Sequence, residues 1–144
     1  MLVLVLVLDA SVVIAASLPD GTDGDTARAL VDRVAALGAV VPALWHIEVG
    51  NALLSNERRG RVQVGRIGQI TAYFHGLPIA VDSETHLHAW ETTMKLSHKH
   101  RLTLYDATYL ELALRRRLPL ASFDVRLCAA AVAEQVETLT GARP

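Results

Sequence analysis

The sequence predicts an α/β fold, a three-layer sandwich with a central, mostly parallel sheet flanked by helices. Short apolar runs alternate along the chain with longer stretches of helical periodicity, which is the pattern of strand–helix–strand units. The first apolar run, residues 2–8, alternates Leu and Val and is apolar on both faces. Such a strand is expected in the middle of a parallel sheet, where helices cover both faces.

The expected strands are short and the expected helices are longer. Strands are expected at residues 2–8, 39–42, 77–81 and 118–122, with a short edge strand at 136–139. Helices are expected at residues 25–38, 43–60, 64–75, 83–100, 103–117 and 124–136. The sequence GTDG, residues 21–24, is expected to form a polar loop.

The ends of several expected helices carry capping residues. Gly38 and Gly60 stand where the first two helices should stop. Ser83 is the candidate N-cap of the helix over residues 83–100. Thr103 and Asp106 fit a capping box at the start of the next helix.

The composition indicates one globular domain, spanning residues 1–144. A hydrophobic content of 51% excludes a disordered chain and favours an exposed apolar surface for a partner or a dimer. The formal net charge is −1, so any contact with nucleic acid needs a local basic surface. The single cysteine, Cys128, excludes an internal disulfide. We expect a cytoplasmic protein in which Cys128 lies on a buried helix face.

The apolar N-terminal run does not fit a membrane segment. It ends at Leu8, well short of the ~20 residues that a spanning helix needs. A signal peptide would carry basic residues before its apolar stretch, whereas the first basic residue here is Arg28. We therefore expect no association with a membrane.

Two carboxylates stand at the ends of expected strands. Asp9 follows the first strand directly, and Asp124 follows the strand over residues 118–122 by two positions. In open α/β sheets, ligands bind beyond the carboxyl ends of the strands, so both should reach the same edge. Taken one at a time, each of these two carboxylates is explained by a structural role alone, as a turn former or a helix cap.

A third carboxylate, Glu48, lies in an apolar helical stretch. Leu44, Ile47 and Leu54 suggest the inward face of this helix, and Glu48 sits on or beside that face. Asn51 follows three residues later and should point the same way.

A fourth carboxylate, Asp106, is completely explained by its place in the capping box. Its combination with Asp9, Glu48 and Asp124 nevertheless indicates a shared site. Clustered carboxylates repel one another, which raises their pKa values. A hard divalent cation removes the cost of this repulsion. Oxygen-only ligands suit Mg²⁺ or Mn²⁺.

Four segments together resemble a known family. They are LDAS (residues 8–11), WHIEVGNAL (45–53), LYDATYLELA (104–113) and LASFDVRL (120–127). In this order and spacing they resemble the PIN-domain ribonucleases, and within that family the VapC toxins of prokaryotic type II toxin–antitoxin pairs. The resemblance spans nearly the whole chain and implies a PIN-like sandwich.

The resemblance implies an activity and assigns residues to it. It implies a Mg²⁺- or Mn²⁺-dependent endoribonuclease whose acidic quartet is Asp9, Glu48, Asp106 and Asp124. Asp9 and Asp106 would bind the metal directly, and Glu48 and Asp124 would act through water or a second ion. The supporting hydroxyl and amide groups would be Ser11, Asn51 and Ser122, where the family more often has Thr in place of Ser122. The implied partners are RNA, a VapB-like antitoxin whose tail covers the acidic site, and a second copy of the chain.

Two basic clusters are candidate phosphate contacts. The first is expected to bind RNA and comprises Arg58, Arg59, Arg61 and Arg66, and the second covers residues 115–117. The alternative for both is a solvated helix end. Trp45, Trp90, Tyr105 and Tyr109 fall at core-like helical positions, so no aromatic stacking platform is expected. The six histidines are expected to be exposed or interfacial and not metal ligands.

Two other functions are compatible with the residues. In a phosphoryl-transfer enzyme acting on a small substrate, Asp9 would be an aspartyl nucleophile, although that pattern would want a second Asp where Ser11 stands. In a non-catalytic interaction module, the four acids would serve only as caps and turn residues.

Overall fold

The computed structural model describes residues 5–19 and 21–139 of the 144-residue chain. Strands and helices alternate, as the sequence predicts. The strands are β1 (Leu6–Leu8), β2 (Ala39–Val41), β3 (Ile79–Val81) and β4 (Leu120–Ala121). The helices are α1 (Ala10–Ser17), α2 (Gly24–Leu37), α3 (Trp45–Arg58), α4 (Ile67–His75), α5 (Thr85–His88), α6 (Thr92–His100), α7 (Leu104–Arg116) and α8 (Val125–Ala133).

The four strands form one parallel sheet in the order β3-β2-β1-β4. The central strand β1 pairs on both sides, with Val7 opposite Val40 of β2 and Leu120 of β4. All three of its residues are fully buried, which confirms the prediction of a buried central strand. Residues 2–4 of the predicted strand lie outside the described residues. The expected edge strand at 136–139 is reduced to one parallel bridge between Leu120 and Thr138.

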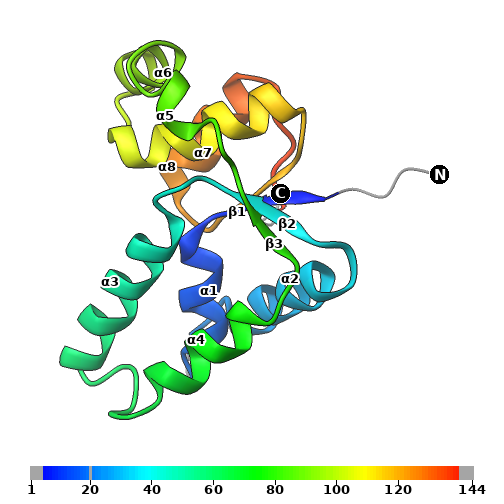
Figure 1. Cartoon of the computed structure of the whole chain (residues 1–144). Coiled ribbons are helices and arrows are strands. Elements are labelled where there is room, and N and C mark those ends of the chain that lie inside the picture. The colour runs from blue at the N-terminus through cyan, green and yellow to red at the C-terminus, as the bar shows by residue number, and fades with distance from the viewer. Residues whose placement is uncertain (1–4, 20, 140–144) are drawn as a thin grey trace.

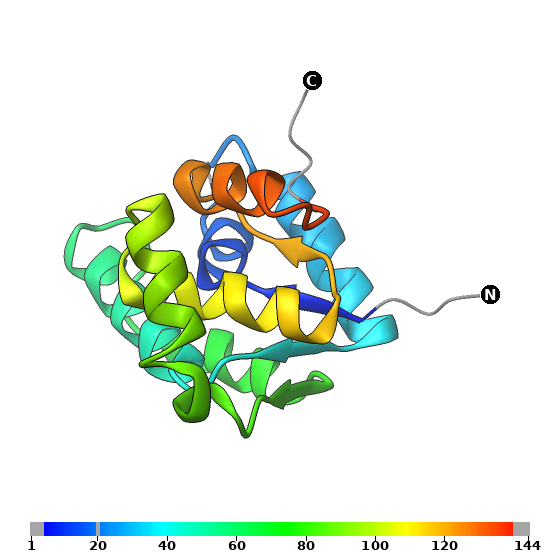
Figure 2. The ribbon, with the colours of Figure 1, turned by 90° about the horizontal axis from the view of Figure 1, so that it is seen from above.

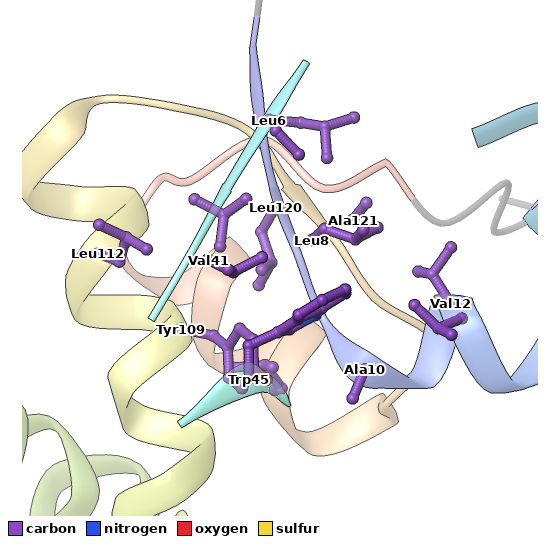
Figure 3. Close-up of a cluster of buried hydrophobic side chains, with 14 of the residues drawn as sticks. Leu6, Leu8, Ala10, Val12, Val41, Trp45, Tyr109, Leu112, Leu120 and Ala121 are labelled. Atoms are coloured by element: carbon purple, nitrogen blue, oxygen red, sulfur yellow. The ribbon is translucent and has the colours of Figure 1, made fainter. Parts of the chain in front are cut away.

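The helices cover both faces of the sheet. Helices α1–α4 gather below the strands and α5–α8 above them (Figure 1). Seen from above, α7 lies over the strands and runs roughly along them, and α6 lies against α7 (Figure 2). The core joins both layers, since side chains from α1, α3 and α7 pack together with those of β1, β2 and β4 (Figure 3). The arrangement confirms the predicted α/β sandwich.

Helix α1 has no counterpart among the expected elements. Its sequence, ASVVIAAS, is apolar nearly throughout and lacks the alternation of polar and apolar faces that marks a surface helix. The helix packs against both α2 and α3, which explains why several of its faces are apolar. Within the described residues, no helix combines the length and the apolar content needed to cross a bilayer.

The single helix expected over residues 83–100 is two helices, α5 and α6, and Ser83 caps neither of them. The N-cap positions belong to Glu84 and Glu91, and Ser83 is exposed before α5. Thr85 holds the start of α5 in place, because its Oγ1 donates to Asp82 Oδ2 (3.0 Å) and accepts from the Ala43 N–H (3.0 Å). The chain turns after α5 so that α6 can pack along α7.

The inward face of α3 differs from the predicted one. Ile47 is 78% exposed and Leu54 is also exposed, whereas the buried apolar positions are Trp45, Val49 and Leu53. These three recur every four residues from the first residue of the helix, so they share one face. The prediction chose the wrong one of two apolar stripes, because α3 carries apolar side chains on both faces.

A buried ion network ties the end of β3 to α7. Arg115 donates to both oxygens of Asp82, from Nη1 to Oδ1 (3.1 Å) and from Nη2 to Oδ2 (2.7 Å), and its Nε donates to Glu111 Oε2 (2.7 Å). Both carboxylates are buried. Burial by itself would raise the pKa of Asp82, but the hydrogen bonds and charge of Arg115, together with hydrogen bonds from Thr85 and the Glu84 backbone, lower that pKa below its usual value. Arg115 is therefore committed to the fold, which leaves only Arg116 and Arg117 of the second basic cluster exposed to phosphate.

Replacing Arg115 with alanine should lower the free energy of unfolding by about 3–5 kcal/mol, because Asp82 and Glu111 would stay buried without their cation. Urea denaturation followed by circular dichroism measures the change. Arg116→Ala is the matched control, since it removes the adjacent exposed guanidinium and should change stability by less than about 0.5 kcal/mol. Equal unfolding midpoints for the two variants would contradict a structural role for the network.

Candidate active site

The four predicted acids stand at the starts of four helices along one edge of the sheet. Asp9 follows β1 and is the N-cap of α1, and Asp124 follows β4 and is the N-cap of α8. Glu48 and Asp106 lie in the first turns of α3 and α7. Helix N-termini carry partial positive charge. This geometry therefore brings carboxylates together where the backbone itself partly offsets their repulsion.

Asp9 is the most buried member of the quartet, with 5% of its surface exposed. Its Oδ2 accepts hydrogen bonds from Ser11 Oγ (2.6 Å) and Ser122 Oγ (2.7 Å). Each hydroxyl in turn accepts a backbone N–H, Ser11 from Phe123 (2.9 Å) and Ser122 from Asp124 (3.0 Å). Each N–H bonds to a lone pair of the hydroxyl oxygen, so the single proton of each hydroxyl stays free to donate to the Asp9 carboxylate. The structure thus places Ser11 and Ser122 around Asp9, where they orient its carboxylate.

Asp106 and Asp124 combine the cap geometry expected of them with a place among the acids. Asp124 Oδ1 accepts from the Leu127 N–H (2.9 Å) at the start of α8. The Asp106 N–H donates to Thr103 Oγ1 (3.1 Å), as the predicted cap requires. Capping and site membership are therefore compatible at both positions, because Asp124 caps with one of its two oxygens and Asp106 takes part in its cap through the backbone N–H.

Glu48 is held by Tyr109, which the sequence predicts only as a core residue. The Tyr109 hydroxyl donates a hydrogen bond to Glu48 Oε1 and so links α7 to α3. The ring of Tyr109 is fully buried beside Leu112 and Trp45 of the core (Figure 3). Burial first, and the nearby charge of Asp9 second, raise the pKa of Tyr109, so its hydroxyl stays a donor. The spacing carried the signal, since Tyr109 follows Asp106 by three residues and shares its helix face.

Asn51 is the one predicted site residue that the network does not include. It is exposed on α3, one turn after Glu48. In the part of the chain that the structure describes, its amide makes no hydrogen bond to Asp9, Glu48, Asp106 or Asp124. Its supporting role remains a prediction.

The geometry agrees with a family assignment over nearly the whole chain. A comparison with protein families matches residues 6–133 to the PIN domain. The chain belongs to the PIN domain family. The resemblance seen in the sequence is thereby confirmed, and a comparison with curated protein sequences gives no match.

Three solved structures share the fold of this PIN domain. PAE2754 from Pyrobaculum aerophilum gives a TM-score of 0.67 at 21% identity, over 96% of this chain and 91% of that one. VapC20 from Mycobacterium tuberculosis, a sarcin–ricin loop cleaving toxin, gives 0.62 at 18% identity, over 96% and 99%. FitAcB from Neisseria gonorrhoeae gives 0.60 at 21% identity, over 94% and 96%. These similarities establish a common fold.

The carboxylates of this PIN domain repel one another. Burial raises the pKa of Asp106 to about 6, with further contributions from the charges of Asp124, Asp9 and Glu48. Burial also raises the pKa of Asp9, against the hydrogen bonds from Ser11 and Ser122. The pKa of Glu48 is raised by burial, against its Tyr109 hydrogen bond, and by the charges of Asp9 and Asp124. Within residues 5–19 and 21–139, no Lys, Arg or His forms an ion pair with any of the four.

The donor set fits a hydrated Mg²⁺ or Mn²⁺ ion. The site offers only oxygen ligands and an excess of negative charge, which hard divalent cations prefer. No three His, Cys, Asp or Glu side chains of the described residues are already arranged as a complete set of ligands. Mg²⁺ commonly binds through one or two carboxylates and keeps several waters, so it does not need such a set.

The predicted RNA-binding arginines stand apart from the acids. Arg58, Arg59, Arg61 and Arg66 lie at the end of α3 and in the loop that leads to α4, and all are exposed. Arg58 follows Glu48 by ten positions along α3, which corresponds to about 15 Å of helix. Arg61 and Arg66 line a hollow of about 330 Å³ together with Arg28 of α2.

Replacing Asp106 with asparagine should raise the free energy of unfolding near pH 7, measured in EDTA, by about 1 kcal/mol. A pKa of about 6 instead of 3.8 means that the folded state holds the Asp106 proton more tightly than the unfolded chain. The wild-type protein therefore loses stability as the pH rises from about 4 to about 6. The full shift would be worth nearly 3 kcal/mol, and solvent screening at a half-buried side chain reduces it.

Denaturant titrations at a series of pH values check this expectation. The gain should vanish below about pH 4, where the carboxyl is neutral in both states. Asp32→Asn, an exposed change on α2, should alter stability by less than about 0.5 kcal/mol. An Asp106→Asn protein no more stable than wild type near pH 7 would show that folding does not raise the pKa of Asp106.

Proposed function

We propose that this PIN domain is a Mg²⁺- or Mn²⁺-dependent endoribonuclease, acting in the cytoplasm as the toxin of a toxin–antitoxin pair. The proposal is carried by one observation: four carboxylates gather around an Asp9 that two serine hydroxyls orient, and within the described residues none of the four forms an ion pair. The family assignment and the toxin VapC20 among the similar structures support it. The four acids of this chain, Asp9, Glu48, Asp106 and Asp124, are the quartet that the sequence resemblance implies.

The chemistry follows from what each residue can do. When bound, the cation would polarise the scissile phosphate and lower the pKa of an attacking water. Asp9 and Asp106 would hold it directly, and Glu48 and Asp124 would act through water or a second ion. Ser11 and Ser122 would keep the Asp9 carboxylate in one orientation, as groups around a metal ligand commonly do.

The proposed partners are a VapB-like antitoxin and a second copy of the chain. The tail of the antitoxin would cover the acidic edge, which is the edge of the sheet that carries Asp9, Glu48, Asp106 and Asp124. What supports them is the exposed apolar surface. Large apolar side chains stand in solvent on α5 and α6 and between them, namely Leu87, Trp90 and Met94. The 84% exposure of Trp90 contradicts its predicted place in the core. Apolar surface of this kind gains free energy when a partner covers it.

Asp9→Asn should abolish RNA cleavage while the protein stays folded, since an amide keeps the shape of the carboxylate but loses its charge. Purified protein with Mn²⁺ and single-stranded RNA, followed by mapping of the RNA ends, measures the activity. The exposed variant Asp32→Asn should cleave like wild type. EDTA should stop cleavage by both active proteins, because removal of the cation leaves nothing to polarise the phosphate.

Two results would reject this function. Cleavage that persists in EDTA would exclude the metal mechanism. No binding of Mn²⁺, together with unchanged stability of Asp9→Asn, would favour a non-catalytic interaction module.

Ser122→Ala should raise the Mn²⁺ concentration for half-maximal cleavage by about 10–100-fold, because Asp9 would lose one of its two orienting hydroxyls. Ser122→Thr keeps the hydroxyl and should stay within a few-fold of wild type. Metal titrations of the cleavage rate distinguish them. An alanine variant with an unchanged metal requirement would show that Ser122 serves packing alone.

A further inference from the structure

The acidic edge has an apolar rim. Three large apolar side chains on it are 65–82% exposed, and each is the immediate sequence neighbour of one of the four acids: Ile47, Tyr105 and Val125. The exposure of Tyr105 contradicts its predicted place in the core. An aromatic ring therefore stands in solvent beside Asp106, at the start of α7.

A cationic hollow lies between the end of α6 and α8. Its volume is about 370 Å³, and its lining includes Arg101, Arg126 and His100. Arg126 follows Val125 directly, and Arg101 lies in the short connection from α6 to α7. The hollow thus lies against α8, which Asp124 caps, and at the connection that leads into α7.

The two arginines of the hollow are uncommitted. Among the described residues, neither Arg101 nor Arg126 forms an ion pair, and both are exposed. The nearby carboxylate of Glu134 is already engaged by Lys99 Nζ (2.7 Å) and His100 Nε2 (2.7 Å). Those two contacts lower the pKa of Glu134, so it remains a charged partner for them. The hollow therefore keeps the positive charge of its arginines.

Other arginines are less suited to a substrate at the acids. Arg115 is bound to Asp82 and Glu111, and Arg28 pairs with Asp25. The cluster from Arg58 to Arg66 begins at the opposite end of α3 from Glu48. By contrast, Arg126 stands in the first turn of α8, at the helix end that Asp124 caps.

We propose that the hollow lined by Arg101 and Arg126 binds a phosphate of single-stranded RNA adjacent to the one that is cleaved, while the base of the same segment stacks on Tyr105. The inference rests on the proposed nuclease function and specifies how its substrate is held. Guanidinium groups bind phosphate through paired, charge-assisted hydrogen bonds. Aromatic rings stack on any base, so this contact would anchor the strand with little sequence preference.

Equilibrium binding separates this inference from the cleavage chemistry. A short fluorescein-labelled single-stranded RNA is titrated with the full-length protein in EDTA, and anisotropy is followed at several salt concentrations. The double variant Arg101→Ala/Arg126→Ala should bind at least about tenfold more weakly. Its slope of log K against log salt should fall in magnitude by about 0.7, because the slope changes by about 0.7 for each phosphate of a single strand that the protein neutralises, and the hollow binds one. Tyr105→Ala should weaken binding about tenfold with an unchanged slope, and Tyr105→Phe should stay within about twofold.

Matched controls test for unspecific effects. Arg116→Ala/Arg117→Ala removes two exposed arginines at the other end of α7, and Tyr73→Ala removes an exposed tyrosine of α4. If Arg101→Ala/Arg126→Ala binds RNA with the same affinity and salt slope as Arg116→Ala/Arg117→Ala, the inference is wrong. The alternative ligand of the hollow would then be an acidic protein partner. If Tyr105→Ala binds like Tyr73→Ala, the stacking contact is wrong.

Cleavage kinetics with Mn²⁺ complete the test. The arginine variants should raise KM while kcat stays within about twofold, because they remove binding and not chemistry. RNA that binds through the hollow but is never cleaved would reject the nuclease function and leave the binding site standing. Cleavage with an unchanged KM in the hollow variant would reject the hollow and leave the nuclease function standing.

Discussion

The acidic edge depends on one constraint: the buried carboxylate of Asp9 stands directly after a strand that cannot move. Strand β1 pairs with neighbours on both sides and exposes none of its surface, so a shift in its register would break two ladders and uncover its side chains. The Asp9 N–H extends the ladder by bonding to the Ala121 carbonyl (3.0 Å). The position of the carboxylate is therefore set by the sheet, and its orientation by the hydroxyls of Ser11 and Ser122.

A second constraint is the electrostatic cost of the quartet. Carboxylates that raise one another's pKa reduce the stability of the folded state near neutral pH. The fold offsets part of this cost by placing each acid at a helix start. In the part of the chain that the structure describes, no cationic side chain pairs with the four acids, whereas Arg115 neutralises Asp82 and Glu111. Local instability held in place by a rigid sheet is typical of functional sites.

The surroundings of the acids divide into a rigid side and an open side. On the rigid side, the Tyr109 hydroxyl holds Glu48, and the Arg115 network fixes α7 against the end of β3. On the open side, Tyr105 and the arginines of the hollow stand in solvent. Side chains that must keep their geometry are thus buried and hydrogen-bonded, while side chains able to contact a flexible RNA strand remain exposed.

The sequence by itself determined the fold class, the place of the first strand, most helices and the four acids, because burial patterns and strand ends are local signals. Its errors have two causes. Ile47 and Tyr105 are apolar residues at helical spacing, and spacing alone does not say which of two faces meets the core. Trp90 lies in the turn between α5 and α6, where the sequence predicts one continuous helix. The division of residues 83–100 into two helices depends on Thr85, whose hydroxyl joins Asp82 to the backbone of Ala43, a residue far away in the sequence.

Only the tertiary structure decided how the acids are supported. The bonds of Asp9 to Ser122 and of Glu48 to Tyr109 span 113 and 61 positions of the chain, and no local pattern encodes such pairs. The same holds for the hollow, whose arginines come from separate elements and show no motif. The sequence determined which side chains would reach the edge of the sheet, and the packing of helices determined which of them are held, paired or left free.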